Sequence, residues 1–192
     1  MKPHALHLLL ALPLAACHSN APAPLERMGP EPTEQHRWLM QLVGDWEAEV
    51  PISAEMQVPA EDGSVSTSAR AEEHVRAHGD YFVVSDGTYD FGASRMASVM
   101  TLGFDPRREV FVGTWIDTAQ PHMWVYEGGL DEAGKVLSLE AFGPSFEDPA
   151  VNALYRDAIE LVDADHKILT SSLRGPDGSW IEFMRTEFVR VR

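Results

Sequence analysis

The stretch VFVGTWIDTAQPHMWVYEGGLD, residues 110–131, decides the fold class because it reads as two strands joined by a short loop. Val110–Ile116 and Met123–Gly129 are both rich in the β-branched and aromatic residues that favour strands. The loop between the strands, Thr118–Pro121, is short, and strands joined in this way are usually antiparallel neighbours. The stretch therefore predicts one β-hairpin.

The same alternation of strand and turn runs along most of the chain. Turn-forming residues punctuate it at Asp90–Gly92, Asp105–Arg108, Asp131–Gly134, Asp163–His166 and Gly175–Gly178. We predict an all-β fold, an antiparallel up-and-down β-barrel of roughly eight to ten strands, because closure into a barrel removes the two edge strands. The expected strands are Asp45–Val58, Ser68–Ala77, Tyr81–Tyr89, Met96–Phe104, Val110–Ile116, Met123–Gly129, Lys135–Phe142, Tyr155–Val162, Ile168–Arg174 and Trp180–Val191.

Two segments carry helical signals. Thr33–Val43 predicts a short helix, with Thr33 as N-cap and Gly44 as its end. The segment Ala69–His78 has the composition of a helix followed by Gly79, but it also fits the series of strands. We assign it as a strand and keep the helix as the alternative.

The N-terminus has the pattern of an export signal. Lys2 precedes an apolar run, Ala5–Ala16, which is shorter than the roughly 20 residues that a spanning helix needs. Leu14-Ala15-Ala16-Cys17 resembles the bacterial lipobox, which implies lipidation of Cys17, the only cysteine. We predict a signal peptide over 1–16, a flexible Pro- and Ala-rich tether over 17–32, and a single barrel domain over 33–192.

This reading predicts an exported lipoprotein that is anchored to a membrane through its N-terminal lipid. His18 follows the cysteine in place of the aspartate that often retains lipoproteins at the inner membrane. In a Gram-negative host the protein is expected at the outer membrane, facing the periplasm. The formal net charge is −15, from 15 Lys and Arg against 30 Asp and Glu, which argues against nucleic acid as a partner.

Gly44-Asp45-Trp46 at the start of the first strand resembles the lipocalin and calycin signature, in which the tryptophan closes the barrel floor. The resemblance implies a basic residue from the last strand packed across Trp46. On strict alternation Ile181, Phe183 and Arg185 share one face of that strand. Arg185 is therefore the predicted partner of Trp46, with Arg190 as its substitute.

A larger resemblance covers almost the whole barrel domain. It rests, in order along the chain, on the segments LVGDWE, TLGFDP, VGTWID, HMWVYEGGLD, GP, YRDAIELVDADHKILTS, GPDGSW and FMR. Together these segments look like the bacterial domain of unknown function 1579 family. That family is uncharacterised, so the resemblance implies a lipocalin-like architecture and no activity.

The hairpin quoted above supplies the candidate ligand pocket, which consists of Trp115, Asp117, His122, Trp124 and Tyr126. If these side chains point inward, they line a cavity with the mixture of aromatic and polar groups that is typical of ligand pockets. Two alternatives remain open: the inward face is packed core without a ligand, or the aromatics point outward and form a binding surface. Alternation within the sequence does not choose between them.

The function predicted from these features is binding of a small apolar ligand inside the barrel of an envelope lipoprotein. The first alternative is a structural or protein-interaction lipoprotein without a ligand. The second is a hydrolase-like or isomerase-like enzyme that uses Asp117 and His122, although no nucleophile motif accompanies them.

No metal and no cofactor are expected. His74 and His78 would share a metal on a helix, but in a strand they lie about 13 Å apart. Haem is the alternative cofactor, with His74, His122 and His166 as the available ligands, none of which lies in a motif that we can match.

Overall fold

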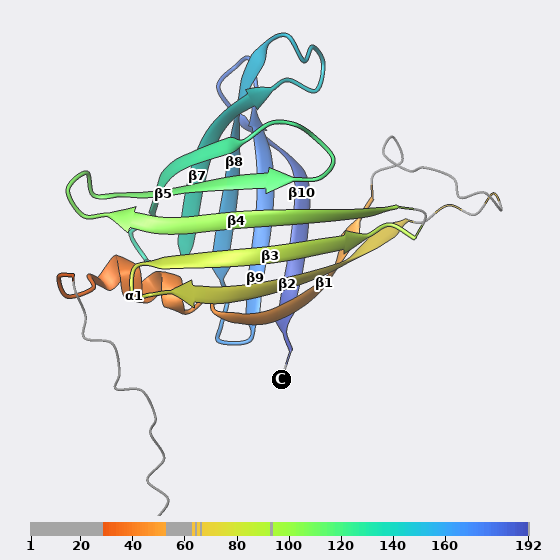
Figure 1. The fold of residues 1–192 in the computed structure, drawn as a ribbon. Coiled ribbons are helices and arrows are strands. Elements are labelled where there is room, and N and C mark those ends of the chain that lie inside the picture. The colour runs from red at the N-terminus through yellow and green to blue at the C-terminus, as the bar shows by residue number, and fades with distance from the viewer. Residues whose placement is uncertain (1–28, 53–62, 64, 66, 93, 192) are drawn as a thin grey trace, which may run out of the picture. The chain divides into compact units, whose positions relative to one another are not determined.

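The computed structural model describes residues 29–52, 63, 65, 67–92 and 94–191. Within these residues the antiparallel strands close into one barrel, in the order β1-β10-β9-β8-β7-β6-β5-β4-β3-β2. Figure 1 shows β2–β5 crossing in front of β7–β10. The elements are α1 (Glu34–Met40), β1 (Gly44–Pro51), β2 (Ser68–His78), β3 (Phe82–Asp90), β4 (Arg95–Asp105), β5 (Val110–Asp117), β6 (Trp124–Leu130), β7 (Val136–Pro144), β8 (Asn152–Leu161), β9 (His166–Arg174) and β10 (Trp180–Arg190).

The predicted up-and-down barrel is confirmed, and each expected strand is present. The segment Ser68–His78 is strand β2, paired along its length with β1 and β3, so the helical alternative for it is wrong. Strand β1 ends at Pro51, and the residues to which we extended it, 53–58, lie outside the described part. The predicted signal peptide, Cys17 and the predicted tether as far as residue 28 also lie outside the described residues.

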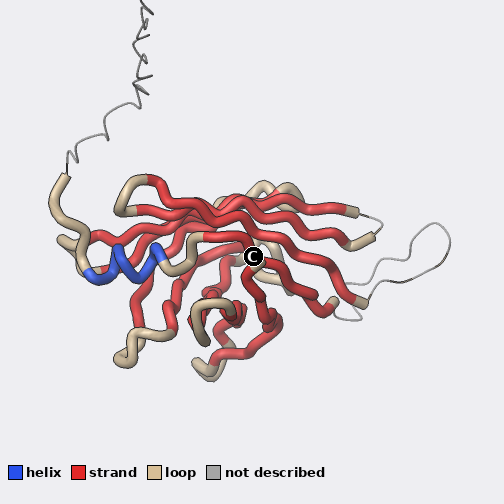
Figure 2. Tube along the Cα trace, turned by 90° about the horizontal axis from the view of Figure 1, so that it is seen from below, coloured by secondary structure: helices blue, strands red, loops and turns tan. Residues whose placement is uncertain are grey.

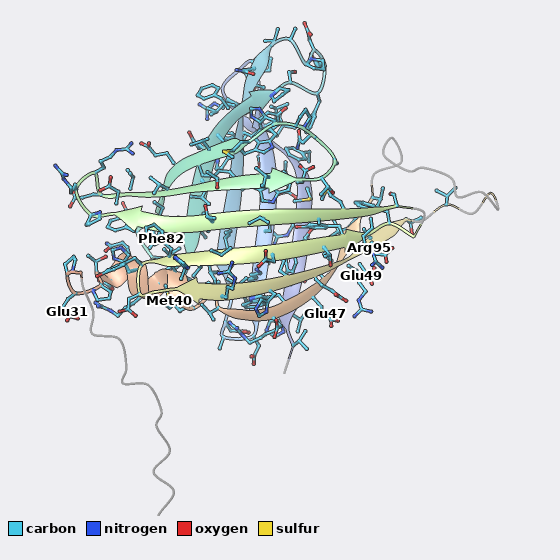
Figure 3. The ribbon with its side chains drawn as sticks, viewed as in Figure 1. Glu31, Met40, Glu47, Glu49, Phe82 and Arg95 are labelled. Atoms are coloured by element: carbon cyan, nitrogen blue, oxygen red, sulfur yellow. The ribbon has the colours of Figure 1, made fainter. Side chains whose placement is uncertain are left out.

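Strand β1 shows how the alternating pattern builds the wall. Trp46, Ala48 and Val50 are buried, and the residues between them, Glu47 and Glu49, are exposed. Figure 3 labels these two glutamates on the outer surface. Because side chains alternate across a strand, one face of each strand fills the interior while the other meets solvent.

Helix α1 begins directly after the expected cap, Thr33, and ends at Met40, three residues before the predicted end at Val43. The backbone N–H of Thr33 donates to Nδ1 of His36 (3.1 Å), which satisfies an N-terminal amide as a capping box does. Trp38 and Leu39 are buried, so the apolar side of the helix packs into the core. Trp38 also donates from its indole nitrogen to the carbonyl of Gly134 (2.8 Å).

Up-and-down connectivity gives the barrel two ends. We call the end that carries α1 and the turns 79–81, 106–109, 131–135 and 162–165 the helix end, and the end that carries 118–123, 145–151 and 175–179 the rim. Figure 2 shows the helix at one end of the strands. The described part of the chain contains no helix that is both long and apolar enough to span a bilayer.

Candidate ligand-binding site in the barrel interior

The β5–β6 hairpin turns its aromatic face into the barrel. Trp115 and Trp124 are partners across the hairpin. Trp124 and Tyr126 are buried, with 9% and 4% of their surface exposed, whereas Met123 and Val125 expose 56% and 63%. The aromatic side chains of the predicted pocket therefore point inward, and the outward-facing alternative is wrong for Trp124 and Tyr126.

Asp117 and His122 lie at the rim, where each makes local contacts. The Asp117 carboxylate accepts hydrogen bonds from the backbone N–H groups of Ala119 (2.5 Å) and Gln120 (2.9 Å), so it holds its own loop. Nε2 of His122 hydrogen-bonds the carbonyl oxygen of Phe142 (3.2 Å). Both residues are described, and no hydrogen bond joins them, so the pair that the enzyme hypothesis requires is not formed.

Aromatic rings in edge-to-face contact close the rim side of the interior. Trp124 contacts both His122 and Tyr155 at centroid distances of 4.9 Å. Tyr155 in turn contacts Phe146 at 5.3 Å and Phe183 at 6.2 Å. Phe146 and Phe183 remain 67% and 48% exposed, so the outermost rings of this cluster face solvent.

An ion pair that the sequence analysis missed lies inside the barrel. Nζ of Lys167, on β9, is 2.5 Å from Oε2 of Glu73, on β2. Both side chains are nearly buried, at 8% and 10% exposure. The Lys167 ammonium also lies 4.8 Å from the ring centroids of both Trp46 and Phe188, which places it over aromatic faces as in cation–π contacts.

A second buried carboxyl group, that of Asp157 on β8, lies further toward the rim. The Ser171 hydroxyl donates to its Oδ1 (2.5 Å), and the Tyr126 hydroxyl donates to its Oδ2. Desolvation by burial raises the pKa of Asp157, and the two hydrogen bonds offset part of that rise. Burial and the nearby charge of Asp157 raise the pKa of Tyr126 well above its ordinary value.

Tyr89 of β3 connects the two carboxyl groups electrostatically. Burial raises the pKa of the Tyr89 hydroxyl above its ordinary value, and the charges of Glu73 and Asp157 raise it further. Tyr89 and Asp157 nevertheless keep some accessible surface, since both are half-buried.

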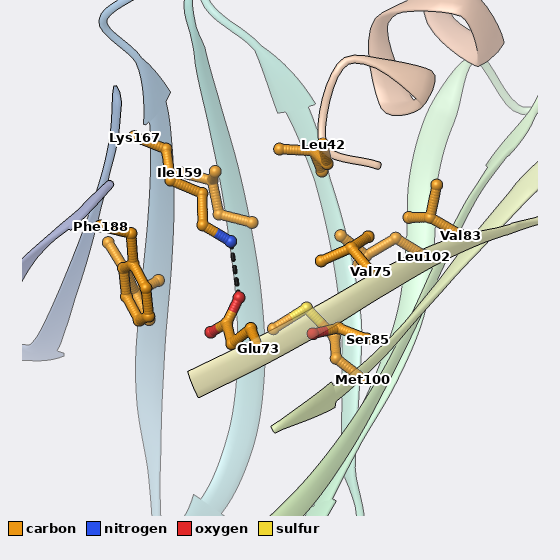
Figure 4. Close-up of a pocket in the computed structure, with 11 residues that line it drawn as sticks. Leu42, Glu73, Val75, Val83, Ser85, Met100, Leu102, Ile159, Lys167 and Phe188 are labelled. Atoms are coloured by element: carbon orange, nitrogen blue, oxygen red, sulfur yellow. Dashed lines mark hydrogen bonds and ion pairs between the residues drawn. The ribbon is translucent and has the colours of Figure 1, made fainter. Parts of the chain in front are cut away.

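A cavity of about 30 Å³ lies beside the ion pair, between it and the helix end of the barrel. Figure 4 shows Glu73 and Lys167 meeting at its edge, with apolar side chains such as Leu102 and Ile159 around the remaining space. A buried water needs roughly 10–15 Å³ of such volume, so the cavity is large enough for about two waters. The cavity is thus water-sized, and its lining is apolar apart from Glu73, Lys167 and Ser85.

Arg190 covers Trp46 and closes the barrel. Its guanidinium carbon lies 4.0 Å from the ring centroid of Trp46, its partner in the β1–β10 register. The two terminal nitrogens donate to the carbonyl oxygens of Val43 (2.5 Å) and Gln41 (2.8 Å). A Cβ at Gly44 would overlap Nη1 of Arg190, so the glycine of the Gly-x-Trp motif leaves room for this side chain.

The prediction of Arg185 as the partner of Trp46 is wrong, and its substitute Arg190 takes that place. Arg185 is exposed on the outer wall, where it reaches the Thr170 hydroxyl (3.3 Å). The cause is a β-bulge between Glu182 and Met184, which inserts one extra residue into β10. Strict alternation fails across a bulge, so residues after it face the opposite side from the one predicted.

The histidines that were considered as metal or haem ligands have other partners. Nδ1 of His74 lies 2.5 Å from Asp45, and Nδ1 of His166 lies 2.8 Å from Asp163 in the β8–β9 turn, all on exposed side chains. His122 lies at the rim. In the residues that the structure describes, no group of three or more His, Cys, Asp or Glu side chains is arranged to hold a metal ion.

The sequence contains a signal for the charged groups inside the barrel, which becomes visible once the strands are assigned. In β8, Asp157 lies between the inward residues Tyr155 and Ile159, both of which are buried. In β2, Glu73 lies in the same way between Ala71 and Val75. A charged residue on the apolar face of a strand is the pattern that identifies both groups.

Comparison with known proteins identifies the family. The family model described as "Protein of unknown function (DUF1579)" matches residues 31–190, which is most of the chain. The chain belongs to this family. The resemblance that the motifs indicated is confirmed, and the DUF1579 description names no activity.

Solved structures match this DUF1579 protein at low sequence identity. The S-type phycobiliprotein lyase CPES from Guillardia theta superposes with a TM-score of 0.51 and 12% sequence identity, over 82% of this chain and 93% of that one. A redesigned β-barrel matches with a TM-score of 0.38 and 11% identity, over 81% and 96%. A search among curated proteins finds no match. The likeness to the lyase confirms a lipocalin-like barrel and, at this identity, shows the fold alone.

Proposed function

We propose that this DUF1579 protein binds a small, largely apolar ligand inside its barrel. The observation that carries the proposal is the set of ionisable groups in a largely apolar interior: the Glu73–Lys167 ion pair and the Asp157 carboxyl group. Ligand pockets typically combine apolar walls with a few polar groups that orient the ligand. A buried ion pair adds little net stability over apolar packing, so packing alone does not account for it.

The interior has side chains that can make room for a ligand. Met100 and Leu169 border the water-sized cavity, and a long unbranched side chain such as that of Met100 can adopt other rotamers. A small barrel either fills its interior or holds one small ligand. In this proposal the structure is the closed state, and ligand binding rotates these side chains and enlarges the cavity.

We propose further that the protein acts at the cell envelope as a lipid-anchored lipoprotein. The support is the apolar run Ala5–Ala16 followed by Leu14-Ala15-Ala16-Cys17, which resembles a lipobox. In a Gram-negative host this places the barrel in the periplasm, attached to the outer membrane. Labelling of cells with a palmitate analogue should tag the wild type, and Cys17→Ala should abolish the label; labelling that persists in this variant would refute the anchor.

The interior site is tested by titrating the full chain with small apolar compounds while following tryptophan fluorescence, with native mass spectrometry as the second readout. Trp115 and Trp124 face the interior and report on it. Ser85→Phe should fill the cavity and weaken binding, whereas Val84→Phe, one position along on the opposite face of β3, should not. Absence of quenching and of any bound mass across the compounds would overturn the proposal.

A second candidate function, docking of a protein partner, has one observation in its favour. Val125 and Phe142 expose 63% and 65% of their surface on the outer wall, and the register Glu127↔Glu140 places them side by side. Exposed apolar patches often mark interaction sites. Val125→Asp should then reduce co-purification of a partner without weakening ligand binding; unchanged co-purification would dismiss this candidate.

A further inference from the structure

The interior of the barrel holds two carboxyl groups but only one cation among its described residues. Lys167 pairs with Glu73. Asp157 accepts hydrogen bonds from Tyr126 and Ser171, which are neutral, and no Lys, Arg or His nitrogen in the described ranges lies within 4 Å of it. Asp157 is therefore the interior acid without a cationic partner.

The surroundings of Lys167 show how this interior accommodates an ammonium group. The Lys167 nitrogen is held by one carboxylate and lies over the rings of Trp46 and Phe188 at 4.8 Å. A carboxylate with aromatic faces around it is the arrangement that recognises alkylammonium ions. The interior of the barrel thus already accommodates one ammonium group, that of Lys167.

Asp157 also has tyrosine side chains around it, and its contacts are with neutral groups. Tyr126 contacts it directly, and the Tyr89 hydroxyl is close enough to be affected by its charge. Tyr155 precedes Asp157 by two residues on the same face of β8, and its ring contacts Trp124. Asp157 also keeps some accessible surface. A carboxyl group with some accessible surface and aromatic side chains are therefore present together.

We infer that the ligand of this barrel is an amphipathic organic amine, whose ammonium group pairs with Asp157 while its apolar body occupies the lumen. The inference rests on the proposed function and names the chemical class of the ligand. The charge of the whole protein agrees with it, since a net charge of −15 attracts cations and repels anions.

Pairing with an ammonium ion is coupled to a proton. Burial favours the neutral form of Asp157 in the empty barrel, whereas an ammonium partner favours the carboxylate. When an already protonated amine binds, Asp157 releases its proton to solvent, so affinity rises as the pH rises through the pKa of the empty site. The other titratable or charged groups near Asp157 are Tyr89 on β3, Tyr126 on β6, Glu73 on β2 and Lys167 on β9.

The test compares three ligands that share one tail: hexylammonium, hexanol and hexanoate. Each is titrated into the full chain by calorimetry, in two buffers of different ionisation enthalpy, so that proton release is measured directly. We expect hexylammonium to bind about tenfold more tightly than the other two, with protons released. Asp157→Asn should remove that preference while hexanol binding stays within about twofold.

The matched control is Asp86→Asn, which removes a carboxylate from the outer wall, where Asp86 faces Arg76 at 3.6 Å. It should leave all three affinities unchanged, and circular dichroism establishes that each variant is folded. Equal binding of the three ligands, a preference for hexanoate, or an unchanged preference in Asp157→Asn would each overturn the ammonium inference and leave the proposed function standing. If none of the ligands binds, the inference and the proposed function both fail.

Discussion

The Glu73–Lys167 ion pair leads to the sharpest prediction about stability. The Glu73 and Lys167 side chains are only 10% and 8% exposed, so neither one regains its hydration when the other is removed. We therefore expect Lys167→Met to lower the free energy of unfolding by about 3–5 kcal/mol, since it leaves a buried carboxylate without a partner. Glu73→Met should cost a similar amount because it leaves the ammonium unpaired.

The double variant should behave differently from the sum of the two single ones. Replacing both partners with methionine removes both desolvation costs, and buried pairs replaced by apolar residues are often as stable as before or more so. The cation–π contacts of Lys167 with Trp46 and Phe188 are lost, which costs about 1 kcal/mol. We therefore expect the double variant within about 1–2 kcal/mol of the wild type.

The measurement is urea unfolding of the four proteins, followed by tryptophan fluorescence and by circular dichroism. A double-mutant cycle then gives the coupling energy of the pair. The Arg76–Asp86 pair, on β2 and β3, is the control, because both side chains are about half exposed (49% and 53%) and breaking it should have no measurable effect. Single variants that lose less than about 1 kcal/mol, or a double variant as unstable as the sum, would refute this reasoning.

Two further predictions concern the barrel floor and the second carboxyl group. Gly44→Ala should lower the free energy of unfolding by about 2–3 kcal/mol in urea titrations, because Gly44 has a φ of +141° and its new Cβ would displace Arg190; a loss equal to that of Gly79→Ala would contradict this. Burial raises the pKa of Asp157 in the folded state, so the folded protein binds this proton more tightly than the unfolded chain does. The stability that this group contributes is present below about pH 4 and is lost as the pH rises through the raised pKa. The wild type should therefore lose stability relative to Asp157→Asn over that range. Parallel pH profiles of the two proteins would count against this prediction.

The barrel could be predicted because strand patterns and turns are local properties of the sequence. Residues 110–131 contain both strands of a hairpin, and the aromatic positions Trp115 and Trp124 become partners through that short loop. The choice between inward and outward faces was not local. It depends on the closure of the whole barrel, which the hairpin alone does not contain.

The interior polar groups show the same limit more clearly. Glu72 and Glu73 are adjacent and chemically alike, yet Glu73 faces the lumen while Glu72 faces Arg70 on the outer wall. Alternation places Glu73 on the apolar face with Ala71 and Val75, and Glu72 on the opposite face. It does not show that Lys167, on a strand far along the sequence, meets Glu73 inside the barrel, because that depends on closure and on the register of every strand between them.

Arg185 was predicted wrongly for a related reason. The residues Ile181–Arg185 contain no glycine or proline that would indicate a bulge. The bulge between Glu182 and Met184 is visible only in the pairing of β10 with β9. Patterns therefore predict how many strands there are more reliably than they predict the direction of each side chain.

Strands β1 and β10 pair with each other along a seam that closes the barrel. The order of the strands around the barrel would therefore stay the same if the chain started at another strand. Two register pairs, Trp46↔Arg190 and Glu47↔Val189, join these strands, and the N–H of Val191 donates to the carbonyl of Asp45 (2.8 Å). Because Arg190 at the end of β10 meets Gln41 at the C-terminal end of α1, a covalent link to the start of α1 has to span about the length of the helix, roughly 10 Å for its 7 residues. A circular permutant opened at the exposed turn 106–109 would keep every strand neighbour, and it would convert this seam from a noncovalent junction into a continuous part of the polypeptide.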